Sequence, residues 1–308
     1  MKIGLSLSEP PPGDDVLGAL TASVEQARAD GHASVWMANI FGLDALTALA
    51  VVGSRVPGME LGTAVVPTYP RHPGALAQQA LTVQAATGGR LALGIGLSHQ
   101  IVIEGMYGLS FDKPARHMRE YLAVLLPLLE SGQVSYEGET LTARMGLSRA
   151  SDRRIPVYLA AMAPRMLQLA GAVADGTVLW MTGPAAIESH VVPTMTAAAE
   201  AAGRTPPRVV CVLPVAVTDD PAGSRAYADK ALRVYNDLPS YRAMLDLEGA
   251  AGPGDVAIVG DEASVTEQIR ALSVIGVTDF VAGSFATGDD AVRTRALLST
   301  LARKANAG

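Results

Sequence analysis

The residues best suited to chemistry follow two β-prone runs of the sequence. Thr63 and Thr68 lie within and just after the run LGTAVVP, while Ser98 and His99 follow the run LALGIGL. Hydroxyl groups hydrogen-bond to ligands, and an imidazole, whose ordinary pKa is about 6.5, also exchanges protons at physiological pH. In a (β/α)8 barrel the carboxyl ends of the strands form the active-site rim. These four side chains are therefore expected at such a rim.

The sequence lacks the common patterns of metal and dinucleotide sites. HxH, HExxH and CxxC are absent, so we predict no metal centre. The histidines other than His99 show no metal-ligand spacing: His32, His72, His117 and His190. GIGLSH has only the first spacing of a GxGxxG fingerprint, which argues against a Rossmann domain. The lone Cys211 lies in the apolar run VVCVLPVAV, so we interpret it as a core residue without a disulfide partner.

The sequence around these residues has the pattern of a βαβ unit. Residues 61–66 and 91–97 are short runs that are apolar on both alternating faces, as in parallel strands buried on both sides. Between them, Pro73 suits a first helical turn, and apolar residues follow at near-helical spacing. The unit therefore predicts two neighbouring parallel strands joined by a helix.

The same alternation of strands and helices continues along all 308 residues. It predicts an α/β fold, a (β/α)8 TIM barrel with insertions, as a single domain over 1–308. The expected strands are 3–8, 34–38, 61–66, 91–97, 156–161, 176–181, 208–217 and 278–282. We expect a loop at 101–114, helices at 114–130 and 184–202, and a hairpin at 134–143 around Glu137 and Gly138. The segment 220–260 reads as a helical insertion before the last strand.

Composition and charge exclude two classes of partner. The chain has a net charge of −6, with 49% hydrophobic and 18% charged residues, and its Lys and Arg side chains are scattered. Without a basic stripe we expect no binding to nucleic acid. No run approaches the roughly 18 apolar residues of a membrane span, and MKIGLSLSEP is too short for a signal peptide. We therefore expect a cytoplasmic protein without a membrane partner.

Five segments, in family order, resemble the luciferase-like monooxygenase superfamily. They are GHASVWMAN, LGTAVVPTYPRHP, GRLALGIGLSH, PVYLAAMAPRMLQLAGAVADGTVLWMTGP and VGDEASVTEQIRALSVIGVTDF, and they span nearly the whole chain. Within this superfamily they look most like the branch that uses the deazaflavin coenzyme F420. The resemblance implies a bacterial luciferase-like barrel that binds F420, or alternatively FMN, and commonly forms homodimers.

The resemblance also implies a set of cofactor contacts. A bulge with a non-proline cis peptide backs the cofactor ring in family members, and the matching peptide here joins Ala64 to Val65, next to Thr63. The alternative is an ordinary strand with Thr63 in the ladder. Many relatives carry an acidic residue and His after the second strand, where this chain has Asn39 and Ile40. Asn39 still forms hydrogen bonds but does not ionise.

His99, with Leu97 and Ser98, occupies the place where some F420 enzymes carry a catalytic Glu. A proton donor there would suit hydride addition to a polarised double bond, which must then be protonated. The alternative is that His99 only hydrogen-bonds the cofactor ring. Both alternatives place it at the cofactor.

The turn AAMAPRM is expected to hold the cofactor phosphate. Small residues there let backbone N–H groups at a helix start approach an anion. The residues concerned are Ala160, Ala161, Met162, Ala163 and Arg165. Relatives often have Gly where Ala163 stands, and the alternative for Arg165 is a solvated helix face.

Tyr107, Trp180 and Met181 are candidate walls of a substrate pocket, which would favour an uncharged or partly apolar small molecule. Two classes of function remain. The first is an F420-dependent oxidoreductase that transfers a hydride between the deazaflavin and a small organic substrate, with an FMN-dependent luciferase-like monooxygenase as its alternative. Because deazaflavin does not readily activate oxygen, the F420 branch favours a dehydrogenase or reductase. The second class is a non-catalytic flavin-binding barrel, motivated by the missing acidic pair.

Overall fold

The computed structural model describes residues 1–148 and 151–306. Its fold class is α/β, the parallel (β/α)8 TIM barrel predicted from the sequence. The chain divides into two compact units. The first unit comprises Met1–Ser8, Ser23–Trp36 and Ala161–Gly308, and the second comprises Glu9–Ala22 and Met37–Ala160. None of the described helices is both long and apolar enough to cross a membrane.

The first unit is built on parallel strands that are almost completely buried. In sheet order they are β9 (Gly176–Trp180), β10 (Arg208–Val217), β12 (Asp279–Ser284), β1 (Lys2–Leu7) and the start of β2 (Ser34–Met37). The short strand β11 (Ile258–Gly260) pairs with Val215–Val217 at the end of β10. The predicted core position of Cys211, in the middle of β10, is confirmed because its side chain is fully buried.

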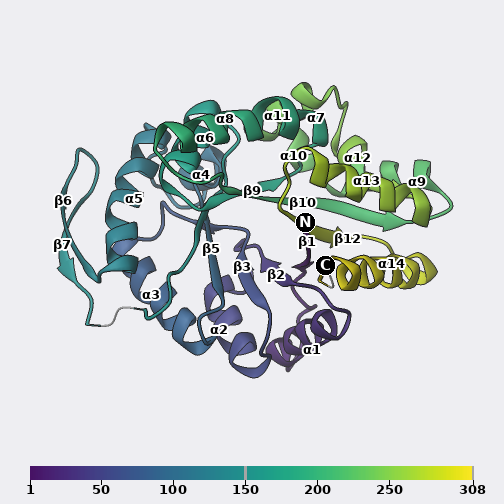
Figure 1. The fold of residues 1–308 in the computed structure, drawn as a ribbon, viewed down its shortest axis with the longest axis horizontal. Helices are drawn as coiled ribbons and strands as arrows, with labels where there is room; N and C mark the ends of the chain where they lie inside the picture. The colour runs from purple at the N-terminus through teal and green to yellow at the C-terminus, as the bar shows by residue number, and fades with distance from the viewer. Residues whose placement is uncertain (149–150, 307–308) are drawn as a thin grey trace. The chain divides into compact units, whose positions relative to one another are not determined.

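Four helices of the first unit come after strands in the sequence. They are α6 (Pro164–Val173), α8 (Val192–Ala201), α13 (Glu262–Val274) and α14 (Gly288–Asn306), and α14 lies beside β12 in Figure 1. The helix predicted over 184–202 is present as an uninterrupted helical run, in which α7 (Pro184–Ala186) passes through a π-helix (Ile187–Val191) into α8. Pro193 has no N–H to continue the regular pattern, and the N–H of Val192 bonds instead to the carbonyl of Ile187.

The segment 221–256 is helical, as predicted, and we call it the helical insertion. It contains α9 (Pro221–Ala231), α10 (Arg233–Asp237), α11 (Pro239–Glu248) and α12 (Pro253–Val256). The Arg242 guanidinium of α11 links α10 to the loop before α12, because it donates to Asn236 Oδ1 at 2.7 Å and to the carbonyl oxygens of Ala250 and Ala251 at 2.7 and 3.1 Å.

The second unit contains β3 (Glu60–Thr63), β5 (Leu91–Gly96) and β8 (Val157–Leu159) in this sheet order, with β4 (Val66–Pro67) also paired to β5. Helices α2 (Ala45–Arg55), α3 (Pro73–Ala86) and α5 (Pro114–Glu130) pack around them, while α1 (Val16–Ala29) is shared between the units. The expected single strand 61–66 is thus interrupted after Thr63. The expected loop 101–114 was partly wrong, since it begins with a short helix, α4 (Gln100–Gly105).

The predicted hairpin is present as β6 (Gln133–Glu137) and β7 (Thr142–Gly146), beside α5 in Figure 1. Its turn is held by Glu120, a 5% exposed carboxylate on α5. This carboxylate accepts hydrogen bonds from the backbone N–H groups of Glu139, Thr140 and Leu141 at 3.1, 2.9 and 3.0 Å. Burial alone would raise the pKa of Glu120, but the bonds from Thr140 and Leu141 outweigh it and lower the pKa.

Candidate functional site

A bulge separates β3 from β4 at the carboxyl end of the strand. The peptide between Ala64 and Val65 is cis, at the position predicted from the sequence. The N–H of Ala64 donates to the carbonyl of Met37 at 2.8 Å. Ala64 and Val65 are half-buried, whereas their neighbours Thr63 and Val66 are fully buried. The bulge therefore presents two small apolar residues at the end of an otherwise buried strand.

The neighbouring strand β5 is shaped to fit this bulge. The Thr63 hydroxyl donates to the Gly94 carbonyl at 2.7 Å and accepts from the Gly94 N–H at 2.9 Å. A Cβ at Gly94 would lie 2.0 Å from the carbonyl oxygen of Thr63, and one at Gly96 would lie 2.7 Å from Val65 Cγ2. The Thr63 hydroxyl therefore links β3 to β5. Because Gly94 and Gly96 have no Cβ, they leave room for the bulge.

Leu97, Ser98 and His99 follow β5 directly and are all half-buried. Ser98 has a positive φ of 61°, which turns the chain out of the strand. His99 then precedes α4 with extended backbone, and its side chain does not cap that helix. Burial lowers the pKa of His99 below its ordinary value, so the neutral imidazole predominates near pH 7.

The side chain of Asn39 is partly committed to local structure. Its Oδ1 accepts a hydrogen bond from the N–H of Ala45, the first residue of α2, at 3.0 Å. The side-chain oxygen therefore helps to hold the loop that connects β2 to α2. Ile40, the other departure from the family pattern, is 58% exposed.

An aromatic cluster that the sequence analysis missed follows β4. The Tyr69 ring stacks on the His117 ring with centroids 3.9 Å apart and planes 5° apart, and Phe111 stacks on Tyr69 at 5.1 Å. His117 Nε2 lies at hydrogen-bonding distance, 3.0 Å, from the buried Thr68 Oγ1. Burial lowers the pKa of His117 to about 4, so this imidazole is neutral near pH 7. The run TYPRHP and the helical spacing of His117 and Tyr121 were the signals available in the sequence.

The turn before α6 divides between the units. Ala160 belongs to the second unit, where its N–H donates to the Ile95 carbonyl at 2.9 Å. In the first unit, Ala161 is buried, Met162 is half-buried, and Ala163 and Arg165 are exposed. The Nε2–H of His190 donates to the Met162 carbonyl at 2.8 Å. Ala163 precedes α6 in extended backbone without a side-chain cap, so no side chain there covers the first N–H groups of the helix.

The three predicted pocket residues have different surroundings. Tyr107, just after α4, is 42% exposed. Trp180, the last residue of β9, is half-buried. Met181 is fully buried with a positive φ of 52°, so its side chain packs inside the first unit.

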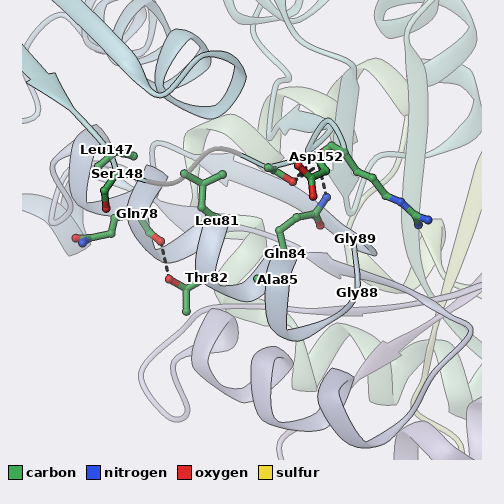
Figure 2. A pocket seen from close by; sticks show the side chains of 12 residues that line it. Gln78, Leu81, Thr82, Gln84, Ala85, Gly88, Gly89, Leu147, Ser148 and Asp152 are labelled. Atoms are coloured by element: carbon green, nitrogen blue, oxygen red, sulfur yellow. Dashed lines mark hydrogen bonds between the residues drawn. The ribbon is translucent and has the colours of Figure 1, made fainter.

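A cavity of about 590 Å³ lies elsewhere, along α3 (Figure 2). It borders Gly88 and Gly89, which precede β5 and therefore mark the amino end of that strand. Its buried amide, Gln84, already donates to the Arg153 carbonyl at 3.2 Å and accepts from the Leu91 N–H at 3.0 Å. The cavity lies at the amino end of a barrel strand, whereas active sites lie at the carboxyl end, and its buried amide already has hydrogen-bond partners. Both observations indicate a structural region.

Within the described residues, His, Cys, Asp and Glu side chains form no group that could hold a metal ion. Burial raises the pKa of the Cys211 thiol to about 12, so it stays protonated and does not act as a nucleophile.

Comparison with known proteins identifies the family. The model of the family described as luciferase-like monooxygenase matches residues 1–279. This chain belongs to the luciferase-like monooxygenase family. It is therefore a luciferase-like oxidoreductase, as its sequence motifs predicted.

Two curated relatives and one solved structure are similar to this luciferase-like protein. It is 27% identical over 307 residues to the 5,10-methylenetetrahydromethanopterin reductase of Methanolobus tindarius, covering 89% of this chain and 92% of the relative. It is 34% identical over 194 residues to a Mycobacterium tuberculosis protein named "Putative coenzyme F420-dependent oxidoreductase", covering 57% of this chain and 54% of the relative. The coenzyme F420 dependent tetrahydromethanopterin reductase from Methanopyrus kandleri shares the fold, with a TM-score of 0.79, 22% identity and 97% of each chain covered.

Proposed function

We propose that this protein is an F420-dependent oxidoreductase that transfers a hydride between the deazaflavin and a small organic substrate. The observation that carries the proposal is the bulge at Ala64 and Val65, which presents a half-buried apolar surface at the carboxyl end of a barrel strand. In TIM barrels this end is where catalysis occurs. The curated relative named for coenzyme F420 supports the choice of cofactor, and the one named as a reductase supports an oxidoreductase reaction.

The residues of the second unit fit the flat ring of a deazaflavin. Ala64 and Val65 are small, apolar and half-buried, so a planar ring can pack against the surface that the bulge presents. FMN has a ring of the same shape and is the alternative cofactor. We assign further ring contacts to Leu97, Ser98, His99 and the free amide hydrogens of Asn39, with Thr63 holding the bulge in place.

The phosphate of the cofactor is assigned to the turn before α6. The positive end of this ten-residue helix favours an anion, and the exposed Arg165 adds its guanidinium charge there. Because Pro164 has no N–H and the Met166 N–H bonds to the Ala163 carbonyl at 2.9 Å, the Arg165 N–H is the group of the first turn that we assign to the phosphate. Ala160, Ala161, Met162 and Ala163 present the backbone of this turn. The hydrogen bond from His190 to the Met162 carbonyl keeps that backbone in place.

Bound F420 would supply or accept the hydride at its ring. His99 would accept or donate the proton that is transferred together with the hydride. Because its pKa is lowered, His99 is mostly neutral near pH 7 and is better prepared to accept a proton from an alcohol than to donate one to a carbonyl. The lowered pKa therefore favours the dehydrogenase direction, while reduction would gain from a lower pH.

We assign a substrate contact to Tyr107 in the second unit and another to Trp180 in the first unit, and the buried Met181 supports Trp180 from within the first unit. A single functional domain over 1–308, a homodimer and a cytoplasmic location belong to the same proposal. Asn39 and Ile40 replace the acidic residue and His of many relatives, and this replacement favours one other function, that of a non-catalytic flavin-binding barrel.

A screen for hydride transfer tests the proposal. The purified protein is mixed with oxidised F420 and a panel of alcohols, and with reduced F420 and activated enones, while the deazaflavin absorbance is followed. Conversion of F420 in either arm is the expected result. Oxygen consumption with reduced FMN, and no reaction with F420, would establish the monooxygenase instead. Cofactor binding without conversion in any arm would favour the non-catalytic barrel.

A further inference from the structure

Three aromatic side chains meet at the carboxyl end of β9 in the first unit. The Tyr235 ring lies edge-on to the Trp180 ring, with centroids 5.7 Å apart and planes at 72°. The Tyr241 ring in turn lies edge-on to Tyr235, at 5.0 Å and 85°. The chain has only 14 aromatic residues (2 Trp, 8 Tyr and 4 Phe), so this cluster holds a large share of them. We call these three residues the aromatic wall.

The helical insertion brings two of the three rings to β9. Tyr235 belongs to α10 and Tyr241 to α11, and Figure 1 shows α11 beside α7, which follows β9. Glu248, the last residue of α11, accepts a hydrogen bond from the Ala186 N–H of α7 at 2.9 Å. This hydrogen bond anchors the helical insertion to the segment after β9. The aromatic wall is therefore held by β9 on one side and by the insertion on the other.

The wall is only partly covered and carries no charge. Trp180, Tyr235 and Tyr241 are each half-buried, although together they form a tight cluster. Burial raises the pKa of both tyrosines, so their phenol groups stay neutral. Two charged side chains of α11 already have partners, since Arg242 donates to Asp246 and to a carbonyl oxygen and Glu248 accepts from the Ala186 N–H.

Edge-to-face packing explains why such a cluster suits a ligand. When two rings meet edge to face, the edge of one ring covers one face of the other, and the remaining faces can pack against a further flat group. Trp180 also lies close to the end of β12, because a Cβ built at Gly283 would be 3.7 Å from its Cζ3. The Trp180 ring thus lies beside the carboxyl ends of β9 and β12, and the carboxyl ends of barrel strands are where substrates bind in this fold.

We infer that the aromatic wall selects an uncharged substrate with a planar conjugated or aromatic group, and that Tyr235 is a specificity-determining residue. The inference rests on the proposed function, since it assigns the wall to the substrate of that reaction. Tyr235 matters most because it touches both other rings.

The two tryptophans of the chain allow a direct test. Trp36 is fully buried and Trp180 is half-buried, so labelling with 5-fluorotryptophan gives two ¹⁹F signals, assigned with Trp180→Phe. The labelled protein is saturated with F420 and titrated with benzylideneacetone, a planar enone, and with 4-cyclohexyl-2-butanone, a similar ketone with a non-planar ring. Tyr235→Ala and Tyr235→Leu are compared with Tyr227→Ala, which removes a 55% exposed tyrosine from α9 of the same insertion.

The planar enone is expected to shift the Trp180 signal and to bind about tenfold more tightly than the non-planar ketone. Tyr235→Ala and Tyr235→Leu should raise its Kd about tenfold, and Tyr227→Ala should leave it unchanged. F420 binding with no Trp180 shift, or wild-type Kd in both Tyr235 variants, would overturn the inference and leave the proposed function standing. Loss of probe affinity in the Tyr235 variants without any F420 binding would uphold the wall and refute the proposed function.

Discussion

Replacing His117 by Gln should remove a pH dependence from the stability of the protein. His117 lies 3.0 Å from Thr68 Oγ1 and stacks on Tyr69 at 3.9 Å. Burial lowers its pKa to about 4, against about 6.5 in the unfolded chain, while the Glu120 carboxylate opposes this shift. The unfolded state therefore binds the proton more readily. The resulting stability is present above about pH 6.5 and is lost as the pH falls toward about 4.

The magnitude follows from these two pKa values. If the pKa shift of His117 acted in full, the free energy of unfolding of the wild type would fall by nearly 2 kcal/mol from about pH 7 to about pH 5. The imidazole is only half-buried, so solvent screening reduces this to about 1 kcal/mol. Gln has no proton to gain in this range and still offers Thr68 a hydrogen-bond partner.

Chemical denaturation of wild type and His117→Gln at both pH values measures the difference. His32 and His99, whose pKa values burial also lowers, remain in both proteins and cancel. NMR titration of the His117 ring checks the pKa directly. Equal pH dependence of the two proteins, or titration of His117 near its ordinary pKa, would refute the reasoning.

Three further substitutions test the site and its support. His99→Ala should lower turnover about a hundredfold if His99 transfers the proton, whereas a weaker cofactor Kd with turnover kept would limit it to binding. Gly94→Ala should cost about 3 kcal/mol in chemical denaturation, because its Cβ would meet the Thr63 carbonyl at 2.0 Å, while Gly105→Ala, with open space around it, is the control. Glu120→Gln should cost about 2 kcal/mol and speed proteolytic cleavage of the β6–β7 hairpin, and unchanged cleavage would contradict its anchoring role.

Elements whose signals are local were predicted well. The helix expected at 114–130 is α5 (Pro114–Glu130), because its apolar stripe and first-turn proline depend only on neighbours in the sequence. The helix α4 was missed because QIVIEG is short and contains β-branched residues, which also suit a strand or loop. The π-helix before Pro193 depends on one missing N–H, which periodicity does not report.

The site was predictable only where a motif marks it. The bulge at Ala64 and Val65 was located from the LGTAVVP segment, and His99 follows β5 as expected. The contacts of Tyr235 with Trp180 and of His117 with Tyr69 join residues far apart in the chain, so no local pattern reveals them. Likewise, the lowered pKa of His99 comes from burial, which only the folded structure shows.

Parallel titrations with F420 and FMN determine which cofactor this protein binds. The purified protein is titrated separately with each cofactor and binding is followed by fluorescence, with Val65→Asp placing a charge on the proposed ring surface and Val292→Asp, at a 70% exposed position on α14, as its control. We expect F420 to bind more tightly than FMN, and we expect this binding to be lost in Val65→Asp and kept in Val292→Asp. Binding of FMN without binding of F420, or F420 affinity unchanged in Val65→Asp, would contradict it.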